Sequence, residues 1–198
     1  MRVVLSIFAA LYYYLQMRKI SLKILEYFGW KLLNNIELPD KCVICVAPHT
    51  SNWDFLWGNL VAKAFHVQSH FLIKKEWFVF PLNIFMHMMG GIPVDRSQKT
   101  SMTDALAELF HTKSKFYLAV APEGTRKLTY KWKKGFYFIA HKAQVPIVLA
   151  FIDYEKKELG FGKLFYTTGN IEQDMLEMMS FYKDKVGRFP ERFHISEL

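Results

Sequence analysis

Short runs of β-prone residues alternate with segments of helical periodicity along this chain, and no other feature constrains its fold as strongly. The predicted strands lie at residues 42–46, 71–73, 92–94, 116–120, 145–152 and 165–168. The predicted helices among them lie at residues 54–65, 103–111 and 134–142. Such alternation is typical of an α/β fold with a central, mostly parallel or mixed sheet flanked by helices. Because no repeat or long Gly/Ser/Pro linker interrupts it, we predict a single domain over residues 36–198.

The composition indicates a basic, aromatic-rich protein with ample apolar surface to bury. Of the 198 residues, 52% are hydrophobic and 17% aromatic, and 26 Lys and Arg against 18 Asp and Glu give a net charge of +8. This excludes a disordered chain and favours an anionic partner, which could be nucleic acid, a membrane surface or a phosphorylated substrate. Cys42 and Cys45 cannot make a disulfide scaffold. Their spacing within a predicted strand points them to opposite sides, so we predict no metal site.

The N-terminal residues predict helices at a membrane surface. Residues 3–17 carry no charge, but they are fewer than the roughly twenty apolar residues that span a bilayer. Residues 20–35 continue with apolar positions at helical spacing. We therefore predict that residues 1–35 form a helix pair in the membrane interface, with basic side chains near lipid phosphates and Trp30 at headgroup depth. The alternative is that the pair packs on the protein's own core.

The loop after residues 42–46 contains His49 and Asp54. In open α/β sheets, ligands gather where strands end in loops. The two side chains can meet if His49 lies in the loop and Asp54 in the first turn of the next helix. A carboxylate beside an imidazole fixes its tautomer and makes it more basic, which suits it to take a proton from a hydroxyl. The alternative is that Ser51 and Asp54 form only a helix capping box and that His49 is an incidental loop residue.

Two later loops could bind a phosphate or a polar headgroup. Arg96 follows Asp95 at the end of a predicted strand, where it could bind a phosphate or form only a surface ion pair. The loop after residues 116–120 reads Pro122-Glu123-Gly124-Thr125-Arg126. The backbone N–H groups, hydroxyl and guanidinium of this loop suit a phosphate, and its carboxylate could accept a hydrogen bond from a glycerol-like hydroxyl. A simple polar turn is the alternative.

The order and spacing of these loops resemble the lysophospholipid/glycerol-phosphate acyltransferase family, which includes the 1-acylglycerol-3-phosphate acyltransferases. That family carries His-x4-Asp, then Gly-x4-Arg, then Pro-Glu-Gly-Thr-Arg, then a Val-Pro-Ile strand. In this chain the four motifs lie at residues 49–54, 91–96, 122–126 and 145–147. The resemblance extends over residues 45–150.

The resemblance implies an O-acyltransferase in which His49 is the general base and Asp54 orients it. The acyl donor would be acyl-CoA or acyl-ACP, used as a co-substrate, and neither a cofactor nor a metal is implied. The acceptor headgroup would be held by Arg96, Glu123, Gly124, Thr125 and Arg126. The implied acceptor is a lysophospholipid, above all 1-acylglycerol-3-phosphate, which would give phosphatidic acid. The implied location is peripheral or monotopic on the cytoplasmic face of a membrane, the inner membrane if bacterial.

Departures from the family pattern keep the acceptor open. Residues that differ from the family's common ones are Pro48, Ala121, Lys127 and Leu149. The acceptor could therefore be another lysolipid, for example an amino-acid-linked lipid. A non-enzymatic basic module that binds a membrane or nucleic acid is a further alternative, since lysines and aromatics interleave at residues 127–134. Such a module leaves the four ordered motifs unexplained, so we expect that the protein does not bind nucleic acid. An esterase using Ser51 would need a Gly-x-Ser-x-Gly elbow, which the sequence lacks.

Two other apolar segments predict helices. Residues 77–89, broken by Pro81, indicate a core helix or a wall of an acyl-chain site, and we favour the core. Residues 174–187 have Met at helical spacing, which predicts a surface helix that covers the core and ends at Gly187.

Overall fold

The structure is a computed structural model that describes residues 2–94 and 99–195, with the backbone alone described for 2–14, 77 and 99–101. A 7-stranded sheet in the order β1-β7-β6-β2-β5-β3-β4 forms its centre. The strands are β1 (Lys31–Asn34), β2 (Lys41–Ala47), β3 (Ser69–Lys74), β4 (Gly91–Val94), β5 (Phe116–Val120), β6 (Ile147–Asp153) and β7 (Glu158–Phe165). Neighbouring strands run parallel except β6 and β7, so the sheet is mixed, as the sequence predicts.

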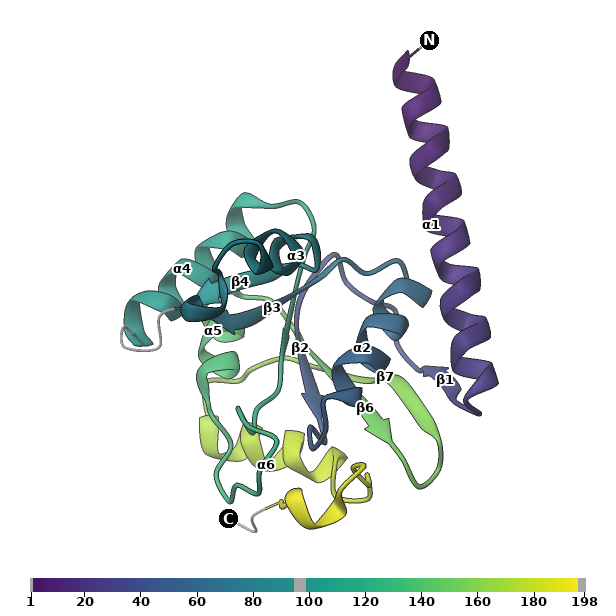
Figure 1. Ribbon diagram of the computed structural model, residues 1–198. Helices are drawn as coiled ribbons and strands as arrows, with labels where there is room; N and C mark the ends of the chain where they lie inside the picture. Colours follow the sequence, from purple (N-terminus) through teal and green to yellow (C-terminus); the bar gives the residue numbers. More distant parts are fainter. Residues whose placement is uncertain (1, 95–98, 196–198) are drawn as a thin grey trace.

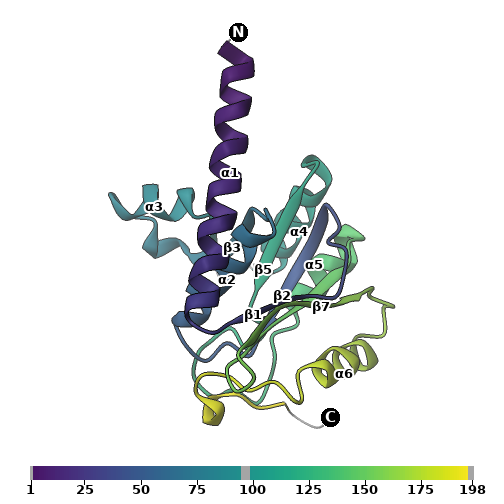
Figure 2. The ribbon, with the colours of Figure 1, turned by 90° about the vertical axis from the view of Figure 1, so that its right-hand side faces the viewer.

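Helices cover both faces of this sheet (Figure 1, Figure 2). The helices are α1 (Arg2–Tyr27), α2 (Trp53–Ala64), α3 (Leu82–Met88), α4 (Lys99–Thr112), α5 (Gly135–Ala143) and α6 (Ile171–Phe181), with short 3-10 turns η1 (Lys75–Trp77) and η2 (Pro190–Arg192). The C-terminal part of α1 packs with α2 on one face, and α4, α5 and α6 pack on the other. This layered arrangement confirms the predicted fold class.

Strands β2 and β6 lie in the interior of the sheet and are buried on both faces. Alternate residues of β2 enter opposite cores: Val43 and Cys45 face the side of α4, α5 and α6, whereas Cys42 and Ile44 face the side of α1 and α2. Every residue of β6 is buried. A strand covered on both faces requires such a continuous apolar run. The cysteine side chains point to opposite sides, as predicted, and both thiols are free.

Helix α6 covers the core as the sequence predicts. Its buried apolar residues are Met175, Met178 and Met179. Just after the helix, the buried Tyr182 hydroxyl donates to the Cys45 carbonyl of β2 at 2.8 Å. The prediction that Gly187 ends this helix is wrong, because α6 stops at Phe181 and the chain then runs back toward the ends of the strands.

The N-terminal segment forms one helix, and the prediction of a helix pair is wrong. No glycine or proline interrupts residues 2–27, so nothing breaks α1. Gly29 adopts a φ of +74° just after the helix, and residues 31–34 pair with β7 as a strand. The N-terminal part of α1 extends away from the sheet (Figure 1, Figure 2). Among the described residues, no helix is both long and apolar enough to cross a membrane.

Helix α3 does not belong to the core, so the core interpretation of residues 77–89 is wrong. None of the residues of α3 is buried. Exposed apolar side chains in and before this helix are Val79, Phe80, Ile84, Phe85 and Met88. The faces of the sheet are already covered by other helices, and α3 projects from the body of the molecule in Figure 2.

Strand β7 precedes the strand predicted at residues 165–168. Gly160 and Gly162 lower the β-propensity of this stretch, so the sequence pattern did not predict a strand there. The strand forms because β6 pairs with it on one side and β1 on the other. At Gly160 the neighbouring backbone approaches so closely that a Cβ would overlap the Leu33 carbonyl oxygen.

Replacing Leu149 of β6 by Ala should destabilise the protein strongly. Leu149 is fully buried, so its truncation leaves a cavity that costs about 2–5 kcal/mol of unfolding free energy. The matched control is Leu176→Ala on α6, where the side chain is 44% exposed and the expected loss is below about 0.5 kcal/mol. Urea unfolding measures both values, and equal losses would contradict the described core.

Candidate active site

The order of the strands brings three loops together. Strands β5, β2 and β6 are adjacent and parallel, so their C-terminal ends meet at one edge of the sheet. The loop after β2 carries His49, the loop after β5 carries residues 122–126, and β6 is followed by Tyr154. This edge is the place where a parallel α/β sheet usually binds its ligand.

His49 and Asp54 face each other across the beginning of α2. The Nδ1 atom of His49 lies 3.3 Å from Oδ2 of Asp54, and their side chains are 24% and 1% exposed. His49 lies in the loop and Asp54 in the first helical turn, the geometry that lets the two residues meet. The structure therefore brings the predicted pair together.

The Asp54 carboxylate also organises the loop itself. Its Oδ2 atom accepts the backbone N–H groups of Thr50 and Ser51, each at 2.8 Å. The Ser51 Oγ atom in turn accepts the N–H of Trp53 at 3.2 Å. The capping interpretation and the pairing with His49 are thus compatible, because one carboxylate holds the helix start and also faces the imidazole.

Tyr154 is a partner of Asp54 that the sequence analysis missed. Tyr154 is the residue just after β6, and its hydroxyl donates to Asp54 Oδ1 at 2.6 Å. Burial, followed by the contact with Asp54, raises the pKa of Tyr154, so the phenol stays protonated and remains a donor. No local pattern could reveal this contact, since the two residues are 100 positions apart.

The orientation of His49 fixes which nitrogen is basic. A carboxylate only accepts hydrogen bonds, so its position 3.3 Å from Nδ1 favours the tautomer of neutral His49 whose proton is on Nδ1. The Nε2 atom then keeps a lone pair and can accept a proton from a bound hydroxyl. The roles of general base for His49 and of orienting carboxylate for Asp54 stay predictions.

Glu123 is buried behind this loop and accepts a hydrogen bond from its backbone. Its side chain is 3% exposed, and Oε1 accepts the backbone N–H of His49 at 2.8 Å. Burial raises the pKa of Glu123 to about 7, against the lowering effect of that hydrogen bond. The structure thus joins the second predicted loop to the first, while a contact of Glu123 with an acceptor stays a prediction.

Gly124 and Thr125 shape the turn that follows Glu123. Gly124 has a φ of +63°, and its N–H donates to the Ala121 carbonyl at 3.0 Å, so its role in the structure is to form the turn. The Thr125 hydroxyl oxygen accepts the N–H of Lys127 at 3.2 Å. The predicted binding roles of both residues remain predictions.

Arg126 reaches the loop of His49 and Asp54, where its guanidinium donates to the Asn52 side chain. A hollow of about 310 Å³ opens beside this contact. It is lined by Thr50, Ser51, Asn52, Trp53, Arg126, Arg188, Phe189 and Arg192. Arg96, the other predicted arginine, lies outside the described residues; the strand before it, β4, ends at Val94.

The C-terminal segment packs directly on the loop of His49 and Asp54, which the sequence analysis did not predict. The N–H of Phe189 donates to Thr50 Oγ1 at 3.2 Å, and the N–H of Tyr154 donates to the Val186 carbonyl at 2.8 Å. At Gly187 a Cβ would lie 2.9 Å from the Thr50 side chain, so this close approach favours glycine. No local pattern in the sequence indicated this packing, because the contact of Phe189 with Thr50 joins positions 139 residues apart.

The residues near His49 do not form a metal centre. Within residues 2–94 and 99–195, no group of three or more His, Cys, Asp or Glu residues could hold a metal ion. The chemistry that this arrangement can perform is proton transfer at Nε2 of His49, beside a hollow lined by arginines.

Comparison with known proteins identifies the family. The family model "Acyltransferase" matches residues 31–152, so the chain belongs to the Acyltransferase family. The human 1-acyl-sn-glycerol-3-phosphate acyltransferase beta is 28% identical over 142 residues, which cover 69% of this chain and 50% of that protein. The chain thus spans about half the length of this curated relative.

A solved structure shares the fold. The crystal structure of the 1-acyl-sn-glycerophosphate acyltransferase PlsC from Thermotoga maritima superposes with a TM-score of 0.57 at 18% identity. The match covers 86% of this chain and 76% of that one. It supports the α/β architecture of this chain.

Replacing Glu123 by Gln should remove a pH dependence of stability. The folded pKa of about 7 exceeds the ordinary 4.5, so the native state holds the proton more tightly than the unfolded state does. This contribution to the free energy of unfolding is fully present below pH 4.5 and is lost as the pH rises through 7.

The free energy of unfolding of the wild type should therefore fall, relative to that of Glu123→Gln, by on the order of 3 kcal/mol as the pH rises across this range. The Gln side chain keeps the oxygen that accepts the His49 N–H, so the variant preserves this contact between the two loops. Urea unfolding at a series of pH values measures the difference. A difference that stays constant with pH would contradict a buried, titrating Glu123.

Proposed function

We propose that this protein is a membrane-associated O-acyltransferase that transfers a fatty acyl group from acyl-CoA or acyl-ACP to a lysophospholipid hydroxyl. The observation that carries the proposal is the contact of His49 Nδ1 with the buried Asp54 carboxylate, which leaves Nε2 as a base. Membership of the Acyltransferase family supports the same chemistry.

The proposed reaction is a single transfer. Nε2 of His49 takes the proton of the acceptor hydroxyl as its oxygen attacks the thioester carbonyl, and Asp54 stabilises the imidazolium that forms. The tetrahedral intermediate then collapses, the C–S bond breaks, and the leaving thiolate takes the proton from His49. The products are an oxygen ester and a free thiol. No acyl-enzyme is needed, because a thioester is already activated.

The proposed acceptor is 1-acylglycerol-3-phosphate, which would give phosphatidic acid. The names of the human relative and of the Thermotoga PlsC support this substrate class. Arg126 and Thr125 are proposed to bind the headgroup, and we propose the same role for Arg96 from its motif. Another lysolipid, for example an amino-acid-linked one, would use the same pair of His49 and Asp54.

Replacing His49 by Ala should abolish acyl transfer, because the hydroxyl loses its proton acceptor. We expect thiol release from palmitoyl-CoA, measured with 1-acylglycerol-3-phosphate present and absent, to be acceptor-dependent and to fall about 10²–10⁴-fold in the variant. Asp54→Asn should also lower the rate, since an amide cannot stabilise the imidazolium. The matched control is His111→Ala, which removes an exposed histidine at the end of α4.

Turnover in His49→Ala that equals the rate of the control would contradict the mechanism. Absence of transfer to 1-acylglycerol-3-phosphate, with transfer restored by another lysolipid or by acyl-ACP, would change the substrate and keep the chemistry. Absence of transfer across the whole panel would favour a binding module.

We further propose that residues 1–35 associate with an anionic membrane on its cytoplasmic face and that residues 36–198 form the acyltransferase domain. Exposed apolar side chains support this, among them Tyr27 and Phe28 at the end of α1 and the group around α3. Apolar side chains beside basic ones are typical of an interfacial segment. The side chain of Arg18 donates to the Ala64 carbonyl and ties α1 to α2, so the extended part of α1 is held by the domain.

Deleting residues 1–14 should release the protein from anionic liposomes while leaving the contact of Arg18 with Ala64 in place. Substituting Ile84 and Met88 of α3 by Asp should weaken binding at least tenfold, since each apolar side chain contributes roughly 1.5–3 kcal/mol when buried. The control is Leu176→Asp on α6, where an exposed apolar side chain lies on a different helix. Co-sedimentation with vesicles measures the partition, and unchanged binding in both variants would contradict the membrane proposal.

A further inference from the structure

The hollow beside the His49 loop is lined by arginines from two distant parts of the chain. Arg126 follows β5, whereas Arg188 and Arg192 come from the C-terminal segment around η2. None of the described residues that line this hollow carries a carboxylate. Guanidinium groups that converge on one cavity repel one another, so the site favours an anion that can neutralise them.

The C-terminal arginines are held by aromatic side chains. The Arg188 guanidinium lies 5.2 Å from the Trp53 ring centroid, and that of Arg192 lies 4.2 Å from the Phe189 ring centroid. A guanidinium over an aromatic ring is attracted by the ring face, a contact that does not use its N–H donors. The structure thus orients both groups without consuming their donors.

Within the described residues, no carboxylate lies at ion-pair distance from Arg126 or Arg188. Arg192 has a neighbour in Glu191, with Nε 3.6 Å from Oε1, and both side chains are largely in solvent. An exposed pair of this kind contributes little to stability, so a ligand anion can compete for the arginine. Arg188 is therefore the arginine of the C-terminal segment whose charge is best placed for a ligand.

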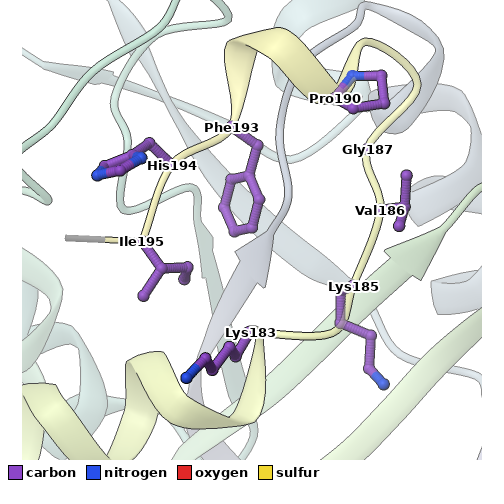
Figure 3. A pocket seen from close by; sticks show the side chains of 8 residues that line it. All are labelled: Lys183, Lys185, Val186, Gly187, Pro190, Phe193, His194 and Ile195. Carbon is purple, nitrogen blue, oxygen red and sulfur yellow. The ribbon is translucent and has the colours of Figure 1, made fainter. Parts of the chain in front are cut away.

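The segment that carries these arginines is fixed in position. Phe189 donates to Thr50, and Gly187 packs against the same side chain. Figure 3 shows the chain from Lys183 to Ile195 folding back on itself, with the Phe193 ring pointing into the space that the loop encloses. A ligand in the hollow would therefore meet guanidinium groups that are already positioned, which lowers the entropy cost of binding.

The start of α2 forms one wall of the same hollow. Thr50, Ser51 and Asn52 precede this 12-residue helix and line the hollow. The Asp54 carboxylate in the first turn of α2 already accepts the N–H groups of Thr50 and Ser51, so the charge that attracts a phosphate comes from the arginines. Thr50, which lines the hollow, directly follows His49 in the chain.

We propose that Arg188 and Arg192 complete, with Arg126, a binding site for a phosphate monoester of a substrate. The phosphate of the acyl acceptor is the ligand that the proposed function assigns to this site, and the 3′-phosphate of CoA has the same chemistry. The assignment to the acceptor rests on the proposed function, whereas the anion site rests on the geometry of the hollow.

Binding of glycerol 3-phosphate tests the site without any reaction. Calorimetric titration of the full chain should give a Kd that rises at least about tenfold in Arg188→Gln and further in the double variant with Arg192→Gln. Glycerol, which lacks the phosphate, should not bind. The control is Lys142→Gln on α5, which removes one positive charge at a surface pair with Asp104. Equal Kd values in wild type and the double variant, with unchanged melting temperatures, would overturn the proposal.

Kinetics then distinguish the source of the phosphate. If the acceptor supplies it, the double variant should raise KM for 1-acylglycerol-3-phosphate and leave KM for palmitoyl-CoA unchanged. If the donor supplies it, the change should follow palmitoyl-CoA and vanish with palmitoyl-dephospho-CoA. Unchanged KM for both substrates would overturn the proposal. If the wild type binds glycerol 3-phosphate but transfers no acyl group, the result would contradict the proposed function and support the anion site.

Discussion

The buried carboxylate of Asp54 is the group on which the rest of the site depends. A charge that is only 3% exposed is costly unless donors surround it. The backbone of Thr50 and Ser51 and the hydroxyl of Tyr154 supply those donors, and the His49 imidazole lies 3.3 Å from the same carboxylate. Because they come from a loop and from the end of β6, satisfying this one charge fixes the helix start, the strand end and the His49 tautomer together.

The strand order explains why the remaining parts converge. The parallel neighbours β5, β2 and β6 end at one edge, and the C-terminal segment covers that edge through Thr50 and Tyr154. A buried Glu123 links the loop after β5 to the backbone of His49. His49 and the arginine-lined hollow are thus parts of one edge of the sheet, joined by hydrogen bonds between the loop after β2, the loop after β5 and the C-terminal segment.

Local patterns predicted much of the fold and the central pair, but not the contacts between distant segments. Alternating β-prone and helical stretches indicated the sheet, and the spacing of His49 and Asp54 indicated their meeting. Tyr154 and the C-terminal segment were missed because their contacts join positions 100 and 139 residues apart. The prediction of two N-terminal helices was wrong because the helical periodicity over residues 20–35 could not show that residues 31–34 pair with β7 as a strand.

The measurement that tests the account most directly is the tautomer of His49, read from the ¹⁵N chemical shifts of its ring in histidine-labelled protein. If the buried Asp54 orients the base, neutral His49 should carry its proton on Nδ1 and leave Nε2 unprotonated, and Asp54→Asn should abolish that preference. A neutral His49 with its proton on Nε2 in the wild type would contradict the account, because the nitrogen assigned to the acceptor hydroxyl would then have no lone pair to offer.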